Sequence, residues 1–185
     1  KSGVLRFLNM RVSSLNDEMA VELITAPAPF AAKRIEELGN KLLTLPFVQS
    51  FTHSIRQSEE SVAIGEQEMF TQGQPMLKEK LGELEFELSP GSFFQTNIAV
   101  ATLLQQKVLE LAQMVLPKSQ EAEVWDVYSG VGAIALALAT RYQKVLGLEI
   151  SEIAVKNAKL NAQLNNLSNC SFVAGDVSKS LRASE

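Results

Sequence analysis

The chain has 185 residues, of which 46% are hydrophobic and 21% are charged, and its formal net charge is −4. This length allows one or two domains, and no apolar run approaches the ~20 residues of a membrane span. A single cysteine excludes an internal disulfide framework, and without a secretory leader we expect a cytoplasmic protein with no membrane contact.

The first half of the sequence predicts a small α+β domain over residues 1–89. Two strands joined by an Asn-Asp turn form a hairpin, and a helix marked by Ile35, Leu38 and Leu42 packs on it. The domain ends at Pro90–Gly91, which is a tight boundary rather than a flexible linker. The expected strands are residues 4–8, 20–24, 48–55, 68–70 and 84–88.

A helix is predicted after this boundary, from Thr96 or Asn97 to Pro117. Its apolar residues recur at helical spacing, so we expect the side that carries them to face the core. Gln95 comes just before the helix, where its side chain either bonds the helix start or reaches a neighbouring crevice. The apolar positions are Leu104, Val108, Leu111 and Val115.

The most informative segment is a short apolar strand at residues 123–127, followed by two glycines that open a helix. Gly130 allows a sharp turn, and Gly132 allows the backbone to approach a ligand. The helix that follows directs its free N–H groups and the positive end of its dipole at that ligand. The segment therefore predicts a nucleotide-binding corner.

Two cofactors fit this corner. Residues 130–135 satisfy the G-x-G-x-x-G/A pattern of dinucleotide-binding enzymes, and both cofactor classes place a carboxylate such as Glu149 on ribose hydroxyls. Asp126 favours S-adenosylmethionine, because its carboxylate can lie near the cationic amino-acid end of that cofactor, directly or through water. The same charge would repel the pyrophosphate of NAD. An NAD-dependent oxidoreductase is the alternative.

The next segment strengthens the methyl-donor interpretation. Ser151 caps a predicted helix in which asparagines are interleaved with small and apolar residues, and residues 170–174 form a third strand. Asp176 follows that strand, where it can meet the adenine amino group. Polar groups at three successive strand ends therefore meet one crevice, which is where open α/β sheets bind ligands.

Two motifs together resemble those of the RNA (uracil-5-)-methyltransferases: LSPGSFFQTN at residues 88–97 and DVYSGVG at residues 126–132. The Phe-Phe-Gln-Thr-Asn element is the more specific one, and the match is closer to members that act on ribosomal RNA than to those that act on transfer RNA. The resemblance implies S-adenosylmethionine-dependent methylation of uridine carbon 5, with 23S ribosomal RNA as the favoured substrate. It also implies that residues 90–185 are the N-terminal half of a Rossmann-like class I methyltransferase domain, an α/β fold truncated after its third strand.

By this resemblance, Gln95, Tyr128 and Glu149 contact S-adenosylmethionine, and Asp176 is expected as a fourth contact. The residues of the glycine corner and the acid before it join this group. The predicted cofactor-binding set is Gln95, Asp126, Tyr128, Gly130, Gly132, Glu149 and Asp176.

The family's chemistry uses a cysteine thiolate that adds to carbon 6 of uracil and a carboxylate-type base that removes the proton from carbon 5. The resemblance places both groups after Glu185, so we expect no catalytic residue in this chain and no activity from the isolated piece. Cys170, the only cysteine, begins a strand and is expected in the core. Several ribosomal members carry an iron–sulfur cluster, which one cysteine cannot hold, so such a cluster would lie upstream of Lys1. No metal site is predicted.

RNA is the expected partner, although the charge gives no broad basic surface. Residues 1–90 hold 9 basic and 13 acidic groups, and residues 91–185 hold 8 of each. A non-catalytic RNA-binding module is therefore the second alternative. Truncation would also leave strand 123–127 as an exposed edge, so we expect self-association. The basic candidates, each either a phosphate contact or an ordinary surface charge, are Arg6, Arg11, Lys33, Arg34, His53 and Arg56. For His53, which lies among serine and threonine residues in an expected strand, a surface position or a satisfied polar contact is favoured, and no catalytic role is assigned.

Overall fold

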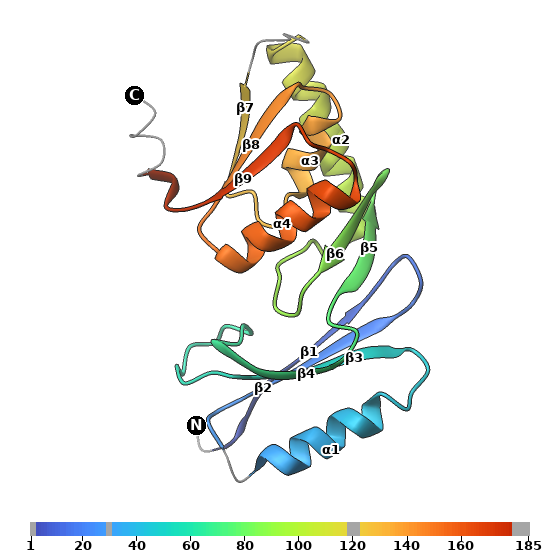
Figure 1. Cartoon of the computed structure of the whole chain (residues 1–185), viewed down its shortest axis with the longest axis vertical. Helices are drawn as coiled ribbons and strands as arrows, with labels where there is room; N and C mark the ends of the chain where they lie inside the picture. The colour runs from blue at the N-terminus through green and yellow to red at the C-terminus, as the bar shows by residue number, and fades with distance from the viewer. Residues whose placement is uncertain (1–2, 29–30, 118–122, 179–185) are drawn as a thin grey trace. The chain divides into compact units, whose positions relative to one another are not determined.

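The computed structural model describes residues 3–28, 31–117 and 123–178. The chain forms two compact units, the first made of residues 1–78 with 89–91 and the second of residues 79–88 with 92–185 (Figure 1). These units differ from the predicted domains in the segment 79–88, which the predicted boundary assigned to the N-terminal domain. The physical reason is that the apolar side chains of this segment belong to the core of the C-terminal unit: Leu81, Leu84, Phe86 and Leu88.

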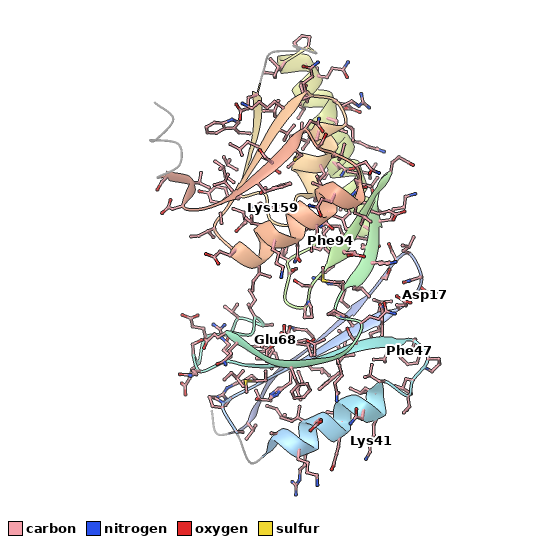
Figure 2. The ribbon with its side chains drawn as sticks, viewed as in Figure 1. Asp17, Lys41, Phe47, Glu68, Phe94 and Lys159 are labelled. Carbon is pink, nitrogen blue, oxygen red and sulfur yellow. The ribbon has the colours of Figure 1, made fainter. Side chains whose placement is uncertain are left out.

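The N-terminal unit is a four-stranded sheet in the order β1-β2-β3-β4, with helix α1 (Ala32–Leu42) packed on it. The pairs β1–β2 and β3–β4 are antiparallel, whereas β2 and β3 are parallel and are joined through α1. The predicted hairpin, helix and third strand are confirmed, and Asp17 in the hairpin turn (Figure 2) has a φ of 57°. The strands are β1 (Leu5–Val12), β2 (Met19–Thr25), β3 (Val48–Ile55) and β4 (Gln67–Gly73).

The core of this unit lies between α1 and the two central strands. Phe51 of β3 is completely buried, and Ile35 is the apolar residue of α1 that is buried against it. Leu38, predicted to face the same core, is 41% exposed, because helical geometry places it to one side of the buried Ile35. The buried cluster consists of Val21, Leu23, Ile35, Val48 and Phe51.

The C-terminal unit contains a three-stranded parallel sheet in the order β7-β8-β9. The sequence prediction for all three strands is confirmed. A two-stranded ladder of β5 (Leu77–Leu81) and β6 (Leu84–Leu88) precedes it. The strands of the parallel sheet are β7 (Glu123–Val127), β8 (Lys144–Glu149) and β9 (Cys170–Ala174).

Three helices pack on the face of this sheet that carries Val145 and Phe172 (Figure 1). They are α2 (Ile98–Val115), α3 (Ala133–Ala139) and α4 (Glu152–Leu164). The opposite face carries more exposed side chains, with Val127 41% and Val173 46% exposed. Alternation of strands and helices with parallel pairing is the Rossmann-like arrangement that the sequence predicts.

The orientation of α2 corrects one prediction. The side of the helix expected in the core is largely exposed, with Leu104 at 51%, Leu111 at 49% and Val115 at 85%. The buried residues are instead Ala101 and Gln105, and the Nε2 of Gln105 donates to the carbonyl of Ala133 at 3.0 Å. A small residue and a hydrogen-bonded amide let α2 approach α3 closely, and bulkier leucines would hold the two helices apart.

Among the described residues, no helix is long and apolar enough to cross a membrane. In the same ranges, no group of three or more His, Cys, Asp or Glu side chains is arranged to hold a metal ion.

Candidate functional site

The glycine corner that follows β7 has an unusual backbone. Tyr128, Gly130 and Gly132 have φ values of 67°, 54° and 90°, so every second residue is left-handed. A Cβ on Gly132 would lie 2.9 Å from Cζ of Phe172, whereas a Cβ on Gly130 would meet nothing within 4 Å. Gly132 is therefore required by packing as well as by its backbone, and Gly130 leaves open space. Strain of this kind clusters at functional sites.

Glu149 ends β8, and both of its carboxylate oxygens accept backbone hydrogen bonds, one of them from this corner. Its Oε2 accepts from the backbone N–H of Gly130 at 3.0 Å, and its Oε1 accepts from that of Ser151 at 2.9 Å. The backbone carbonyl of Glu149 also accepts from Gly175 N–H, at 2.9 Å, in the turn after β9. One residue thus connects the ends of all three parallel strands.

Asp126 lies inside β7, where its carboxylate is turned toward α3. Its Oδ2 accepts from the backbone N–H of Ala135 at 2.8 Å, which satisfies one of the free donors in the first turn of that helix. Burial and the negative charge of Glu149 raise the pKa of Asp126 to about 6, against the lowering effect of the Ala135 hydrogen bond. Asp126 therefore has a structural contact that the sequence did not indicate.

The segment from Ser92 to Gln95 places its side chains alternately inward and outward. Phe94 (Figure 2) is 5% exposed, and its ring centroid lies 5.2 Å from that of Phe86. Phe93 and Gln95, on either side, are exposed. The cap of α2 is Asn97, whose Oδ1 accepts from Val100 N–H at 3.1 Å, so Gln95 is not the residue that caps this helix.

Two further predicted contacts lie at the exposed edge of the sheet. Tyr128 is 74% exposed. Asp176 is exposed and its Oδ1 accepts from the N–H and Oγ of Ser178, at 2.8 and 2.6 Å. The structure thus brings six of the seven predicted residues to the carboxyl ends of β7, β8 and β9, and Gln95 lies two residues before the cap of α2.

Two asparagines of α4, which the sequence interpretation noted without assigning them to the site, bond this corner and the segment before α2. The Nδ2 of Asn161 donates to the carbonyl of Val131, between the two glycines, at 3.2 Å. The Nδ2 of Asn157 donates to Oγ of Ser92 at 2.6 Å. Both asparagines are buried, at 0% and 3% exposed. Their spacing of four residues was the available signal, because it places both side chains on one side of a helix.

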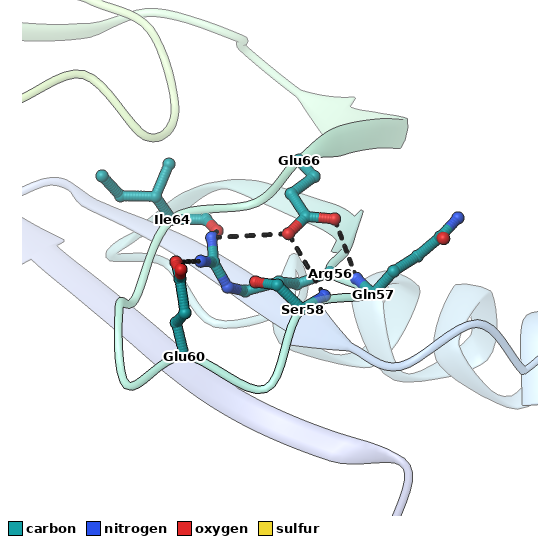
Figure 3. Close-up of polar contacts among 6 residues, drawn as sticks. All are labelled: Arg56, Gln57, Ser58, Glu60, Ile64 and Glu66. Carbon is teal, nitrogen blue, oxygen red and sulfur yellow. Dashed lines mark hydrogen bonds and ion pairs between the residues drawn. The ribbon is translucent and has the colours of Figure 1, made fainter.

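Two of the basic residues suggested as RNA contacts, Arg56 and His53, are buried, which contradicts a phosphate contact for both. For His53, the satisfied polar contact that the sequence favoured is confirmed. Arg56 is 6% exposed and donates to the carbonyl of Ile64 at 2.8 Å and to Glu60 at 2.9 Å, which fixes the loop between β3 and β4 (Figure 3). His53 is also 6% exposed, and its Nε2 lies 3.0 Å from Oγ1 of Thr25. Burial lowers the pKa of His53, which favours its neutral form.

Cys170 is buried in the core of the C-terminal unit, as predicted. Burial, together with the charge of Asp126, raises the pKa of its thiol to about 12. A thiol with this pKa is protonated at neutral pH and is a poor nucleophile.

Comparison with known proteins shows which family the chain belongs to. The chain matches the tRNA (Uracil-5-)-methyltransferase family over residues 31–181. An uncharacterized RNA methyltransferase of Nitratidesulfovibrio vulgaris is 37% identical over 186 residues, covering 98% of this chain and 38% of that protein. Another, from Geobacter sulfurreducens, is 35% identical over 179 residues, covering 96% of this chain and 35% of that protein. The chain thus spans well under half the length of these relatives.

Solved structures show the same fold. The crystal structure of Pyrococcus abyssi tRNA (uracil-54, C5)-methyltransferase in complex with S-adenosyl-L-homocysteine has a TM-score of 0.71 and 28% identity, covering 95% of this chain and 40% of that one. The M. jannaschii tRNA m1G37 methyltransferase has a TM-score of 0.52 and 15% identity, covering 94% and 48%, and shares the fold alone. The α/β fold is therefore that of Rossmann-like, class I S-adenosylmethionine-dependent methyltransferases. With a family match over residues 31–181 and this structural likeness, the chain belongs to the tRNA (uracil-5-)-methyltransferase family.

Proposed function

We propose that this chain supplies the methyl-donor site of an enzyme that methylates carbon 5 of a uridine in RNA. The observation that carries the proposal is the carboxylate of Glu149, which bonds Gly130 N–H at 3.0 Å and so lies fixed at the glycine corner. A carboxylate at the end of the second strand is the group that binds ribose hydroxyls in Rossmann-like sites. The relative from P. abyssi, whose structure contains S-adenosyl-L-homocysteine, supports the choice of cofactor.

The remaining contacts follow from the geometry of the corner. Gly130 leaves open space for the ligand. The side chains of Tyr128 and Gln95 are exposed and are assigned to further contacts with it. Asp176 is assigned to the adenine amino group. Asp126 is assigned to the amino-acid end of the cofactor, directly or through water, although one of its oxygens already serves Ala135. Its negative charge disfavours a pyrophosphate.

The chemistry requires groups beyond these. A thiolate adds to carbon 6 of uracil, carbon 5 then attacks the methyl group and releases S-adenosylhomocysteine, a base removes the carbon 5 proton, and the thiolate leaves. Cys170 is buried and protonated, so it does not supply the thiolate. We assign the nucleophile and the base to segments following residue 185 in a longer protein, and any iron–sulfur cluster to segments before residue 1. By itself this chain is expected to be inactive.

The RNA substrate is the finer part of the proposal. The sequence motifs favour 23S ribosomal RNA, whereas the family description and the P. abyssi relative name tRNA. Binding of fluorescently labelled 23S fragments and of tRNA, measured side by side, decides between them. The enzyme is proposed to act in the cytoplasm, where both RNAs are found.

Calorimetric titration tests the cofactor. We expect S-adenosylhomocysteine to bind and NAD not to bind, and Glu149→Ala to abolish binding. Glu152→Ala is the matched control, because this exposed acid lies three residues further along in α4. Tighter binding of NAD than of S-adenosylhomocysteine would contradict the proposal and favour an oxidoreductase.

The buried cysteine also favours a second candidate, a non-catalytic RNA-binding module. The two functions differ in their need for the cofactor site. In cells, Asp126→Ala or Glu149→Ala should impair RNA methylation while RNA binding is unchanged. Indifference to both substitutions would favour the binding module.

A further inference from the structure

Three asparagines spaced four residues apart form a row along α4 and its C-cap: Asn157, Asn161 and Asn165. Asn165 bonds both backbone groups of Glu85, accepting from its N–H at 2.9 Å and donating to its carbonyl at 2.6 Å. Asn161 accepts from Glu87 N–H at 2.8 Å. Amide side chains of a helix therefore satisfy backbone groups of β6 that another strand would otherwise pair with.

The spacing of this asparagine row explains how a helix can do this. Four helical residues rise by about 6.0 Å, and two strand residues rise by about 6.8 Å. Side chains at i and i+4 of α4 therefore match alternate residues of β6, and the pairs Asn165–Glu85 and Asn161–Glu87 run in opposite directions. The next position in the row, Asn157, extends beyond the end of β6 to Ser92.

Two members of the row also contact segments assigned to the cofactor. The amide of Asn161 uses its oxygen for β6 and its nitrogen for the carbonyl of Val131, between Gly130 and Gly132. Asn157 holds Ser92, three residues before Gln95. The glycine corner and the Ser92–Gln95 segment are thus fixed to one helix, although nearly forty residues separate them in the sequence.

We propose that Asn157 and Asn161 are positioning residues for the methyl donor, an assignment that rests on the proposed function. They hold the two segments in place before the ligand arrives, so that binding does not have to order them. Burial strengthens this positioning. Removing the donor would leave a buried carbonyl such as that of Val131 without a hydrogen bond, which destabilises the folded corner.

Asn165 provides a matched control within the same row. Its side chain bonds Glu85 and the carbonyl of Asn161, and these partners belong to β6 and α4 rather than to the two cofactor segments. The variants Asn157→Ala, Asn161→Ala and Asn165→Ala should all lower the stability of the C-terminal unit. They should differ in what happens at the site.

The test measures hydrogen–deuterium exchange of peptides covering residues 92–97 and 130–133, and calorimetric affinity for S-adenosylhomocysteine. Asn157→Ala should raise exchange in the first segment and Asn161→Ala in the second, and each should weaken affinity by about tenfold, equivalent to one buried hydrogen bond. Asn165→Ala should leave both exchange rates and the affinity within about twofold. If Asn157→Ala fails to fold, Ser92→Ala removes the other partner of the same hydrogen bond and should give the same result.

Unchanged exchange in both segments would overturn the inference, whatever the affinity. Equal changes in exchange and affinity in all three variants would also overturn it. They would show that the asparagines stabilise the fold in general and have no specific effect on the two segments. A wild-type chain that binds no S-adenosylhomocysteine, while exchange rises in the expected segments of the variants, would overturn the proposed function and the assignment to the methyl donor. It would still show that the two asparagines order these segments.

Discussion

Replacing Asp126 with asparagine should stabilise the C-terminal unit at neutral pH and have little effect near pH 4. The native pKa of Asp126 is about 6, above its ordinary value of 3.8, because the carboxyl is buried and lies near Glu149. A raised carboxyl pKa means that the folded state holds the proton more tightly, so stability falls as the pH rises from about 4 to about 6. This rise in the pKa corresponds to a loss of about 3 kcal/mol in the free energy of unfolding once the carboxyl is ionised.

Asparagine is suited to this test because its amide oxygen can still accept from Ala135 N–H, while the charge is removed. Urea unfolding at a series of pH values between 4 and 7.5 would be followed by the fluorescence of Trp125, the only tryptophan, which lies in β7. The free energy of unfolding of Asp126→Asn minus that of the wild type should grow across this range by up to about 3 kcal/mol.

Glu83→Gln controls for the loss of one negative charge from the same unit, because Glu83 is exposed in the turn between β5 and β6. It should give no comparable gain. A stability difference for Asp126→Asn that stays constant with pH would refute the reasoning, since it would show that the carboxyl has the same pKa in the folded and unfolded chains.

The remaining predictions concern the corner, the loop and the sheet edge. Gly132→Ala should cost more stability than Gly130→Ala, by about 1–3 kcal/mol in urea unfolding, because only at position 132 does a Cβ meet the ring of Phe172; equal costs would show that the backbone alone matters. Arg56→Gln should speed proteolysis within residues 57–66 without unfolding the sheet, since the guanidinium holds Ile64 and Glu60; unchanged cleavage would contradict this. Light scattering should show self-association through the edge strand β7, and a monodisperse monomer at high concentration would count against it.

Short strands rich in β-branched and aromatic residues were predictable from the sequence. The strands at 48–55 and 123–127 have the expected limits, because each is a short run of this composition. β5 was missed because Leu77 and Leu81 are its only apolar residues, and the three residues between them are charged. The composition of this strand limited the prediction, since β6 has the same length and was predicted.

The faces of helices were harder to predict. α2 carries two series of residues at helical spacing, and the one with Ala101 and Gln105 is buried, although the one with Leu104 and Leu111 is more hydrophobic. Periodicity cannot choose between two such series, because the choice depends on how closely the neighbouring helix approaches.

The candidate site was predictable as a set of strand ends, but its internal bonds were not. The sequence placed Asp126 and Glu149 at one edge of a parallel sheet, which follows from strand order alone. That Asp126 would serve the first turn of α3 depends on the distance between strand and helix, about which the sequence carries no signal. The burial of His53 and Arg56 likewise depends on the packing around them, so their polar character alone could not predict it.

Cys170 makes the chain its own reporter of breathing motions. Because this single thiol lies in the C-terminal unit and burial keeps it protonated, a thiol reagent can label it only when that unit opens. The labelling rate at low denaturant therefore measures the frequency of such openings without any engineered probe. Opening of the N-terminal unit exposes no thiol and therefore gives no labelling, so this reaction reports the opening of the C-terminal unit alone.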